Sequence, residues 1–185
     1  MRARTLEATR PVNTIRERAW PINVNKALLL LRVVVGMLFI GHGLQKTLGL
    51  FGGQGFAQWT QDVAKLGLIP AAPWAALEAG AEIGGGLMLV LGLFASVGAA
   101  LIVADMLVAI VKVHLPKGLW SQQGGFEYNL VLIALLVAIG IMGPGLYSLE
   151  RRLPFSLPRP ATFVVTLAVA LAVSAAGLLG LTPRG

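Results

Sequence analysis

Two carboxylates lie inside an apolar run that is long enough to cross a membrane. Glu78 and Glu82 belong to the segment 73–94, and a separation of four residues places them on one face of a helix. A charged side chain in hydrocarbon costs about 2.5 kcal/mol or more on insertion scales. We therefore expect this face to meet protein or a polar cavity and not lipid.

Further ionisable residues stand in other apolar runs or at their ends. A buried carboxyl group beside an imidazole can bind and transfer protons. The same side chains can ligate metals, but the chain has no Glu-x-x-His pair of the kind found in di-metal bundles, so we predict no metal. Haem is also disfavoured, because both histidines lie at helix ends. The candidate site residues are His42, Glu78, Glu82, Asp105, His114 and Glu127.

Each candidate also has a purely structural interpretation. Asp105 and Lys112 are seven residues apart, so they share one helical stripe and can neutralise each other. Glu82 can pair within the same cluster. Glu127 can favour the positive end of the helix that it begins. The two histidines can be ordinary residues of the membrane interface, and the sequence leaves these alternatives open.

The composition is that of an integral membrane protein. Of 185 residues, 56% are hydrophobic and only 12% are charged, whereas a soluble domain has about 25% charged residues. We predict an all-α fold, an integral membrane four-helix bundle with a fifth C-terminal transmembrane helix. The predicted spans cover about residues 27–45, 73–94, 96–115, 127–143 and 161–181.

The spans divide the chain into four parts. We predict a basic arm (1–26), a four-helix membrane domain (27–150), a linker (151–160) and an additional span with a short tail (161–185). Between the first two spans, apolar residues from Phe56 to Leu66 recur at helical spacing, which is typical of a helix lying on the membrane surface. That helix is either a connector or a lid over a pocket.

The distribution of Lys and Arg predicts the orientation of the chain. Ten of the 15 basic residues fall on the side of the N-terminal arm and the linker, including Arg32, which is expected to reach that interface. Five fall on the other side, so we place the N-terminus in the cytoplasm and the C-terminus outside. All intramembrane ionisable groups except Arg32 then lie in the outer half of the bilayer. We expect this bilayer to be a prokaryotic cytoplasmic membrane.

Composition also limits cofactors and partners. The chain contains no cysteine, which excludes iron–sulfur clusters and thiolate-bound metal within it. Its net charge of +7 is concentrated in the arm beside the first span, so we predict contact with membrane lipid and not with nucleic acid. Small residues at a spacing of four predict close packing with other subunits or a second copy. These residues are Gly80, Gly84, Ala168, Ala172 and Ala176.

An ordered set of short motifs resembles the DoxX family of small membrane proteins. The set comprises Gly-His42-Gly-Leu-Gln-Lys46, Glu78 with Glu82-Ile-Gly-Gly-Gly86, His114-Leu-Pro-Lys-Gly118, Gly-Gly-Phe-Glu-Tyr128 and Gly-Pro-Gly145. The resemblance covers about residues 27–150 and implies a four-helix membrane bundle; the arm and the fifth span lie outside it. It also implies an association with quinol oxidase or thiosulfate:quinone oxidoreductase, without a defined set of catalytic residues. His42, Glu82, His114 and Glu127 occupy family-like positions.

The leading hypothesis is a redox-associated membrane subunit. It would bind a quinone or similar small molecule in the outer half of the bundle and work with a partner oxidoreductase of the thiosulfate:quinone type. A non-catalytic accessory subunit of a larger complex is the main alternative. A small-molecule transporter is less favoured, because five spans show no broken helix and no inverted repeat.

Overall fold

The computed structural model describes residues 22–180, which form helices joined by turns and contain no strand. This confirms the all-α prediction. The longest loop does contain the predicted short helix, α2. The helices are α1 (Ile22–Leu48), α2 (Gly55–Lys65), α3 (Ala71–Leu91), α4 (Ala95–Ala109), α5 (Glu127–Met142) and α6 (Arg159–Leu178).

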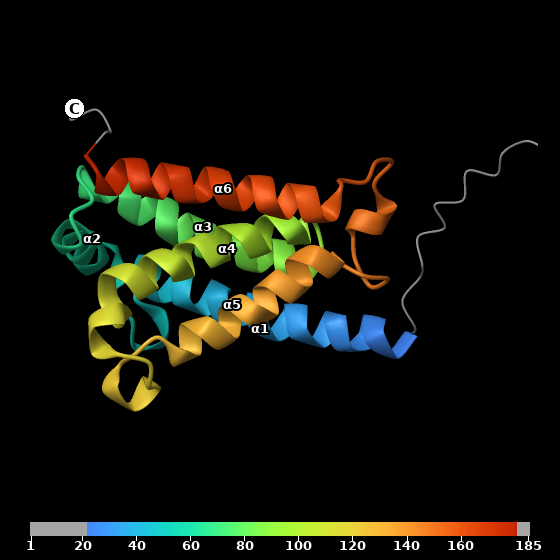
Figure 1. Ribbon diagram of the computed structural model, residues 1–185, viewed down its shortest axis with the longest axis horizontal. Coiled ribbons are helices and arrows are strands. Elements are labelled where there is room, and N and C mark those ends of the chain that lie inside the picture. The colour runs from blue at the N-terminus through green and yellow to red at the C-terminus, as the bar shows by residue number, and fades with distance from the viewer. Residues whose placement is uncertain (1–21, 181–185) are drawn as a thin grey trace, which may run out of the picture.

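Four helices are long and apolar enough to cross a membrane: α1, α3, α6 and α4 with its continuation to Lys117. The continuation begins with a π-helical turn over Ile110–His114, which widens the end of α4. Helix α5 has 16 residues, and at 1.5 Å per residue it extends over about 24 Å, somewhat less than the hydrocarbon core of a bilayer. It nevertheless runs alongside the long helices (Figure 1).

The five long helices lie along the long axis of the molecule (Figure 1). Helix α4 packs against α3, α5 and α6, while α1 packs mainly against α3. One end of the bundle carries α2 and the loop before α5, and the other end carries the start of α1 and the linker between α5 and α6 (Figure 1). We call these the α2 end and the linker end.

Consecutive glycines let α3 approach two neighbouring helices. A Cβ at Gly86 would lie 2.6 Å from the backbone oxygen of Gly36 on α1, and a Cβ at Gly85 would lie 3.0 Å from that of Gly98 on α4. Larger apolar side chains form the rest of the hydrophobic core. Its fully buried side chains include Phe39, Leu89, Ile102, Leu136 and Ile139.

The fifth span packs against its own bundle. Helix α6 lies against α4 and α5, where Phe163 occupies the space that a side chain at Gly140 would need. Near the other end of α6, Trp74 of α3 packs in the same way over Gly177. These two contacts position the helix along one side of the bundle.

Arg32 does not reach the membrane interface as predicted. Its side chain is completely buried and donates hydrogen bonds to the backbone oxygen of Pro144 and, at 2.6 Å, to that of Tyr147. The linker between α5 and α6 folds over the guanidinium group. The backbone oxygens of Pro144 and Tyr147 in this linker supply the hydrogen-bond acceptors inside the protein. Arg32 therefore anchors the linker to α1.

Candidate functional site

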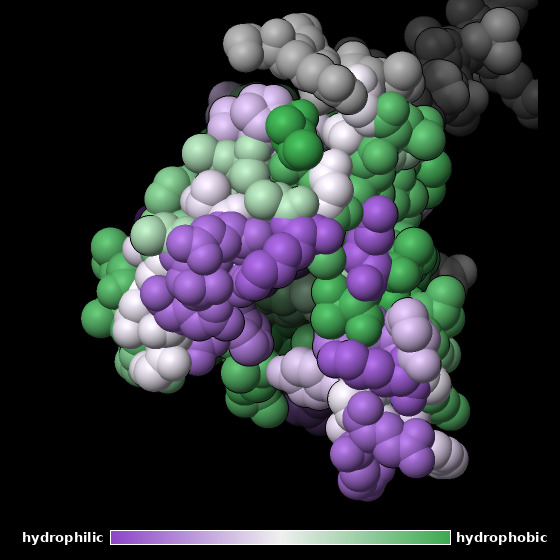
Figure 2. Space-filling view, turned by 90° about the vertical axis from the view of Figure 1, so that its left-hand side faces the viewer, coloured by the Kyte–Doolittle hydropathy of each residue, from purple (hydrophilic) through white to green (hydrophobic). Residues whose placement is uncertain are grey.

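A cavity of about 830 Å³ lies among the helices at the α2 end. All six helices contribute to its walls, which are mostly apolar. Figure 2 looks onto this end and shows polar residues around a hollow, with more hydrophobic residues deeper inside. The polar and ionisable lining residues are His42, Lys46, Trp59, Glu78, Glu82, Asp105, Ser121, Tyr128, Asn129, His114, Thr166 and Ser174.

Lys46 provides the cation that faces the two glutamates. Its Nζ lies 3.2 Å from Oε1 of Glu78 and 3.1 Å from Oε1 of Glu82. Only 3% of the Glu82 side chain is exposed, against 20% for Lys46. Because α1 and α3 are antiparallel neighbours, the end of α1 meets the first half of α3, and the ion pairs connect the two helices inside the bundle.

Asp105 of α4 joins this cluster from a third helix. Its side chain lines the same cavity as Glu78 and Glu82, and the charge of Lys46 acts on it as well. Three carboxyl groups from two helices therefore lie at this cavity beside one ammonium group.

Three polar atoms around this cavity are buried without a hydrogen-bond partner among residues 22–180. They are Oε2 of Glu82, Oδ2 of Asp105 and Nε1 of Trp59. Buried polar groups in folded proteins are nearly always hydrogen-bonded, and an unsatisfied one costs about 1–3 kcal/mol. Two acceptors and one donor at the surface of one apolar cavity form a set that a bound molecule with its own polar groups can satisfy.

Trp59 brings α2 into the site. Nζ of Lys46 lies over its indole ring, 4.2 Å from the ring centroid, and forms a cation–π contact. Val63 and Leu68 pack below it against Ala75 of α3, so the apolar stripe of α2 faces the bundle. The helix therefore covers part of the cavity, which is the position expected of a lid. On its outer side, a hydrogen bond from Lys65 holds the pKa of Asp62 below its usual value.

The two histidines line the cavity and also have local partners. Nδ1 of His42 lies 3.1 Å from the side-chain oxygen of Gln45, and the ring meets Phe39 edge-on. Nδ1 of His114 lies 2.8 Å from the backbone oxygen of Gly124. With Nδ1 engaged in each ring, Nε2 is the nitrogen left to interact with a ligand.

Glu127 is separate from this site. One carboxylate oxygen accepts a hydrogen bond of 3.0 Å from the backbone nitrogen of Ser121, and the residue does not line the cavity. Glu127 therefore braces the loop 115–126 at the start of α5. The other five sequence-predicted candidates are brought together around the cavity.

The cation of the cluster was not identified from the sequence. Lys112 was the expected partner of Asp105, but it is exposed and forms no ion pair within residues 22–180. The π-helical turn that contains it shifts the helical register away from the regular stripe. Lys46 follows His42 by four residues, which places both on one face of α1, and this spacing is the signal that could have identified it.

Four of the five small residues predicted to form packing ridges face outward, and the fifth, Ala176, is partly buried. A Cβ at Gly80 or Gly84 would meet nothing within 4 Å, and Ala168 and Ala172 are exposed on α6. Within this chain the close helix contacts use Gly85 and Gly86 instead. The ridges remain available to a partner outside the chain.

Within the described residues, no group of three or more His, Asp or Glu side chains has the arrangement needed to hold a metal ion. The chemistry at hand is that of carboxyl groups, an ammonium group, imidazoles and an indole N–H. These residues define an all-α multi-pass membrane protein with a polar cluster at the wall of an apolar cavity.

The DoxX family model matches residues 27–115, so this part of the chain is similar to the DoxX family. The match runs from α1 through the end of α4, so it includes Lys46, Trp59 and the carboxyl cluster, while α5 and α6 lie beyond it. One curated relative is the uncharacterized membrane protein Rv3486 of Mycobacterium tuberculosis. It is 28% identical over 139 residues, which cover 69% of this chain and 81% of that protein. No solved structure matches the chain.

Proposed function

We propose that this protein is a redox-associated membrane subunit that binds a quinone-class small molecule in the cavity at the α2 end. The observation that carries the proposal is the set of unpartnered atoms on Glu82, Asp105 and Trp59 around a mostly apolar cavity. A quinone ring presents carbonyl oxygens that accept hydrogen bonds, and a quinol presents hydroxyl groups that donate them. The apolar walls suit the ring and its hydrocarbon tail.

Each residue has a distinct part in this proposal. Trp59 donates its indole N–H to an acceptor oxygen of the ligand, while Glu82 and Asp105 accept from a hydroxyl group. Lys46 holds the Glu82 carboxylate in place through the ion pair of 3.1 Å. Glu78 and Asp105, which line the same cavity, take up or supply a proton at their carboxyl oxygens.

Electron transfer calls for a second protein. A quinone when bound carries electrons together with protons, but the chain contains no cysteine with which to oxidise or reduce a sulfur substrate. We therefore propose that a partner oxidoreductase, of the thiosulfate:quinone type by family resemblance, exchanges electrons with the ligand. The chain itself binds, orients and exchanges protons.

Fluorescence quenching tests the ligand class. Trp59 and Trp74 line the cavity, so decylubiquinone bound there will quench their emission in the purified full-length protein. We expect Asp105→Asn to weaken binding about tenfold or more, because a hydrogen bond to a charged group contributes about 1.5–3 kcal/mol. Asp105 has no ion pair within 4 Å among the described residues, so this change leaves the Lys46 contacts in place.

Glu127→Gln is the matched control. It removes one carboxylate at the same end of the bundle but outside the cavity, so its affinity for decylubiquinone should equal that of the unmodified protein. Equal affinities for Asp105→Asn, Glu82→Gln and Glu127→Gln would refute a quinone site in this cluster. A comparison with decane at the same concentration distinguishes recognition of the quinone ring from simple partitioning of a hydrocarbon into apolar space.

An accessory role is the second candidate, and the outward ridges favour it. A side chain at Gly80 or Gly84 on α3 would meet open space, and Ala168 and Ala172 on α6 are exposed, as a surface for other subunits or a second copy requires. Native mass spectrometry of the protein in gently solubilised membranes tests this. Loss of a stoichiometric partner on Gly80→Leu, with Asp105→Asn silent, would select the accessory role.

A further inference from the structure

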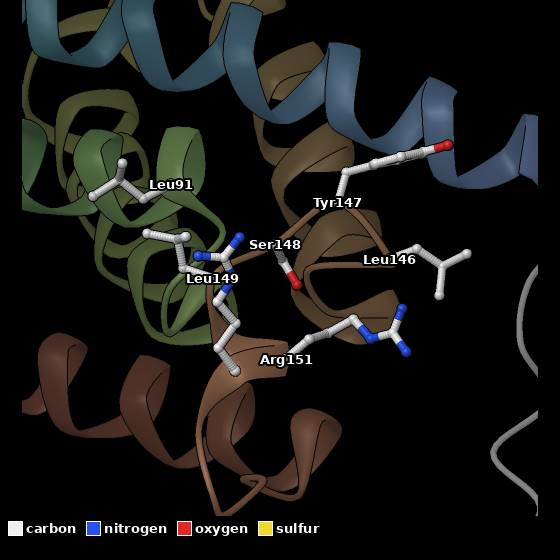
Figure 3. A pocket seen from close by; sticks show the side chains of 7 residues that line it. Leu91, Leu146, Tyr147, Ser148, Leu149 and Arg151 are labelled. Carbon is white, nitrogen blue, oxygen red and sulfur yellow. The ribbon is translucent and has the colours of Figure 1, made fainter.

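A second pocket lies at the linker end of the bundle, opposite the cavity. It has a volume of about 500 Å³ and is bounded by the end of α3 and by the segment between α5 and α6. Figure 3 shows it from close by, with the Arg151 side chain extending from the linker on the side where Leu146 lies. The lining residues are Leu91, Leu146, Tyr147, Ser148, Leu149, Arg151 and Arg152.

Backbone hydrogen bonds hold the walls of this pocket in place. The nitrogens of Leu149 and Glu150 each donate, at 3.1 Å, to the carbonyl oxygens of Leu91 and Gly92 at the end of α3. From the other side, Arg32 donates to the oxygen of Tyr147 at 2.6 Å. The linker is thus tied to both α3 and α1, so the pocket exists before any ligand binds.

The pocket carries two positive charges that no carboxylate within residues 22–180 pairs with. Arg151 and Arg152 are exposed and take part in no ion pair within residues 22–180. The carboxylate of Glu150, which precedes them in the chain, acts on the buried guanidinium of Arg32. Guanidinium groups bind phosphate oxygens well because their donors match phosphate geometry.

Apolar side chains surround these two charges. Leu91 is 45% exposed and Leu149 is 40% exposed, so two leucines border the same pocket as the arginines. Phe94 and Phe155 stack close by with ring centroids 6.4 Å apart, and aromatic residues are typical of the membrane interface. A free phosphate ion would gain nothing from the leucines, whereas a lipid would place its chains along them.

We propose that this pocket binds the headgroup of an anionic phospholipid. Arg151 and Arg152 contact the phosphate, and the acyl chains run from the pocket over Leu91 and the apolar outer face of α3. Basic pockets between membrane helices are known to take such headgroups. The site is independent of the cavity at the α2 end and does not depend on the ligand proposed there.

The test measures lipid retention by the full-length protein. Delipidated protein in neutral detergent is titrated with phosphatidylglycerol or, separately, phosphatidylcholine, and bound lipid is counted by native mass spectrometry. We expect Arg151→Ala with Arg152→Ala to weaken phosphatidylglycerol binding about 25-fold, because each basic residue contributes about a factor of five at an anionic surface. Binding of phosphatidylcholine should be weak and unchanged.

Lys112→Ala with Lys117→Ala is the matched control, since it removes two exposed charges at the opposite end and should leave binding intact. Equal loss in both double variants would show a general charge effect and overturn the proposal. Retention of phosphatidylcholine as tight as phosphatidylglycerol would also overturn it. If millimolar inorganic phosphate displaces the lipid completely, the site recognises free phosphate and the lipid assignment is wrong.

A melting measurement on Arg151→Ala with Arg152→Ala separates loss of lipid binding from loss of folding. Neither arginine forms a hydrogen bond or ion pair to another described residue that the double substitution would break, so melting in detergent alone should be unchanged. The charge-conserving pair Arg151→Lys with Arg152→Lys should keep most of the affinity. Loss of binding in this pair, with melting unchanged, would point to guanidinium geometry in place of charge.

Discussion

The ammonium group of Lys46 lies 3.1 Å from the Glu82 carboxylate, which is almost completely buried in the bundle. The two residues are 36 positions apart and belong to antiparallel neighbours, α1 and α3. A buried charge without a partner is strongly unfavourable. This ion pair therefore connects α1 to α3 inside the bundle and leaves Oε2 of Glu82 without a protein partner among the described residues.

The first prediction concerns this pair. Lys46→Met removes the cation and leaves Glu82 and Glu78 without a counter-charge, so we expect the free energy of unfolding to fall by about 3 kcal/mol or more. Thermal melting in detergent is the measurement. The double variant Lys46→Met with Glu82→Gln should recover part of the loss, because it removes the uncompensated charge.

Lys65→Met provides the comparison. Lys65 pairs with Asp62 at 2.7 Å on α2, but its side chain is 69% exposed, and exposed pairs contribute only about 0–1 kcal/mol. Its melting temperature should be nearly that of the unmodified protein. Equal effects of the two lysine substitutions would contradict a special role for the buried pair.

The second prediction concerns neighbouring glycines on α3. In Gly86→Ala the new Cβ would lie 2.6 Å from the backbone oxygen of Gly36, so α1 and α3 must move apart, at a cost of about 1–3 kcal/mol. In Gly84→Ala the Cβ meets nothing within 4 Å. That variant should be neutral or slightly stabilising, since Ala favours helix.

The substitutions Gly84→Ala and Gly86→Ala lie two positions apart in one helix, so the two variants have the same composition and the same intrinsic helix propensity. Thermal melting of both in the same detergent is sufficient. A larger loss for Gly84→Ala would mean that its face packs against another subunit in the purified protein, and a cross-linking measurement would then be needed to identify the contact.

The third prediction concerns Arg32. A lysine at this position keeps the charge but cannot reach the oxygens of both Pro144 and Tyr147, so one carbonyl loses its donor. We expect Arg32→Lys to lower stability by about 1–2 kcal/mol and to make the segment 143–158 more sensitive to protease. Arg151→Lys makes the same exchange at an exposed position and should change neither property.

The fourth prediction concerns orientation. Because the chain contains no cysteine, single cysteines report accessibility without background. With the orientation proposed from the basic residues, a membrane-impermeant maleimide added to intact cells should label Lys117→Cys but not Arg152→Cys. Permeabilisation should expose the second site. The reverse pattern would place the cavity at the cytoplasmic end.

The fifth prediction concerns Trp59. Its Nε1 atom has no hydrogen-bond partner in the described part of the chain, so Trp59→Phe should change melting little while it keeps an aromatic ring beneath Lys46. If the indole N–H contacts the ligand, affinity measured by isothermal titration with decylubiquinone should fall about threefold to tenfold. Unchanged affinity would exclude this contact and leave only the carboxyl groups as recognition elements.

Much of the architecture follows from the sequence alone. Long apolar runs interrupted by glycine, proline and charge require helices, because backbone groups in hydrocarbon must be satisfied within their own segment. The alternating direction of successive spans then assigns His42, Glu78, Asp105 and His114 to one end. This argument needs only helix rise and chain order, and the structure brings these residues together around one cavity.

What the sequence could not decide is the choice of partners within each end. Lys46 instead of Lys112 meets the carboxylates, Gly85 and Gly86 instead of Gly80 and Gly84 face the neighbouring helices, and Arg32 turns inward beneath the linker. Each of these depends on how far a helix is rotated about its axis. Rotation is set by packing against several neighbours at once, so only the tertiary structure decides it.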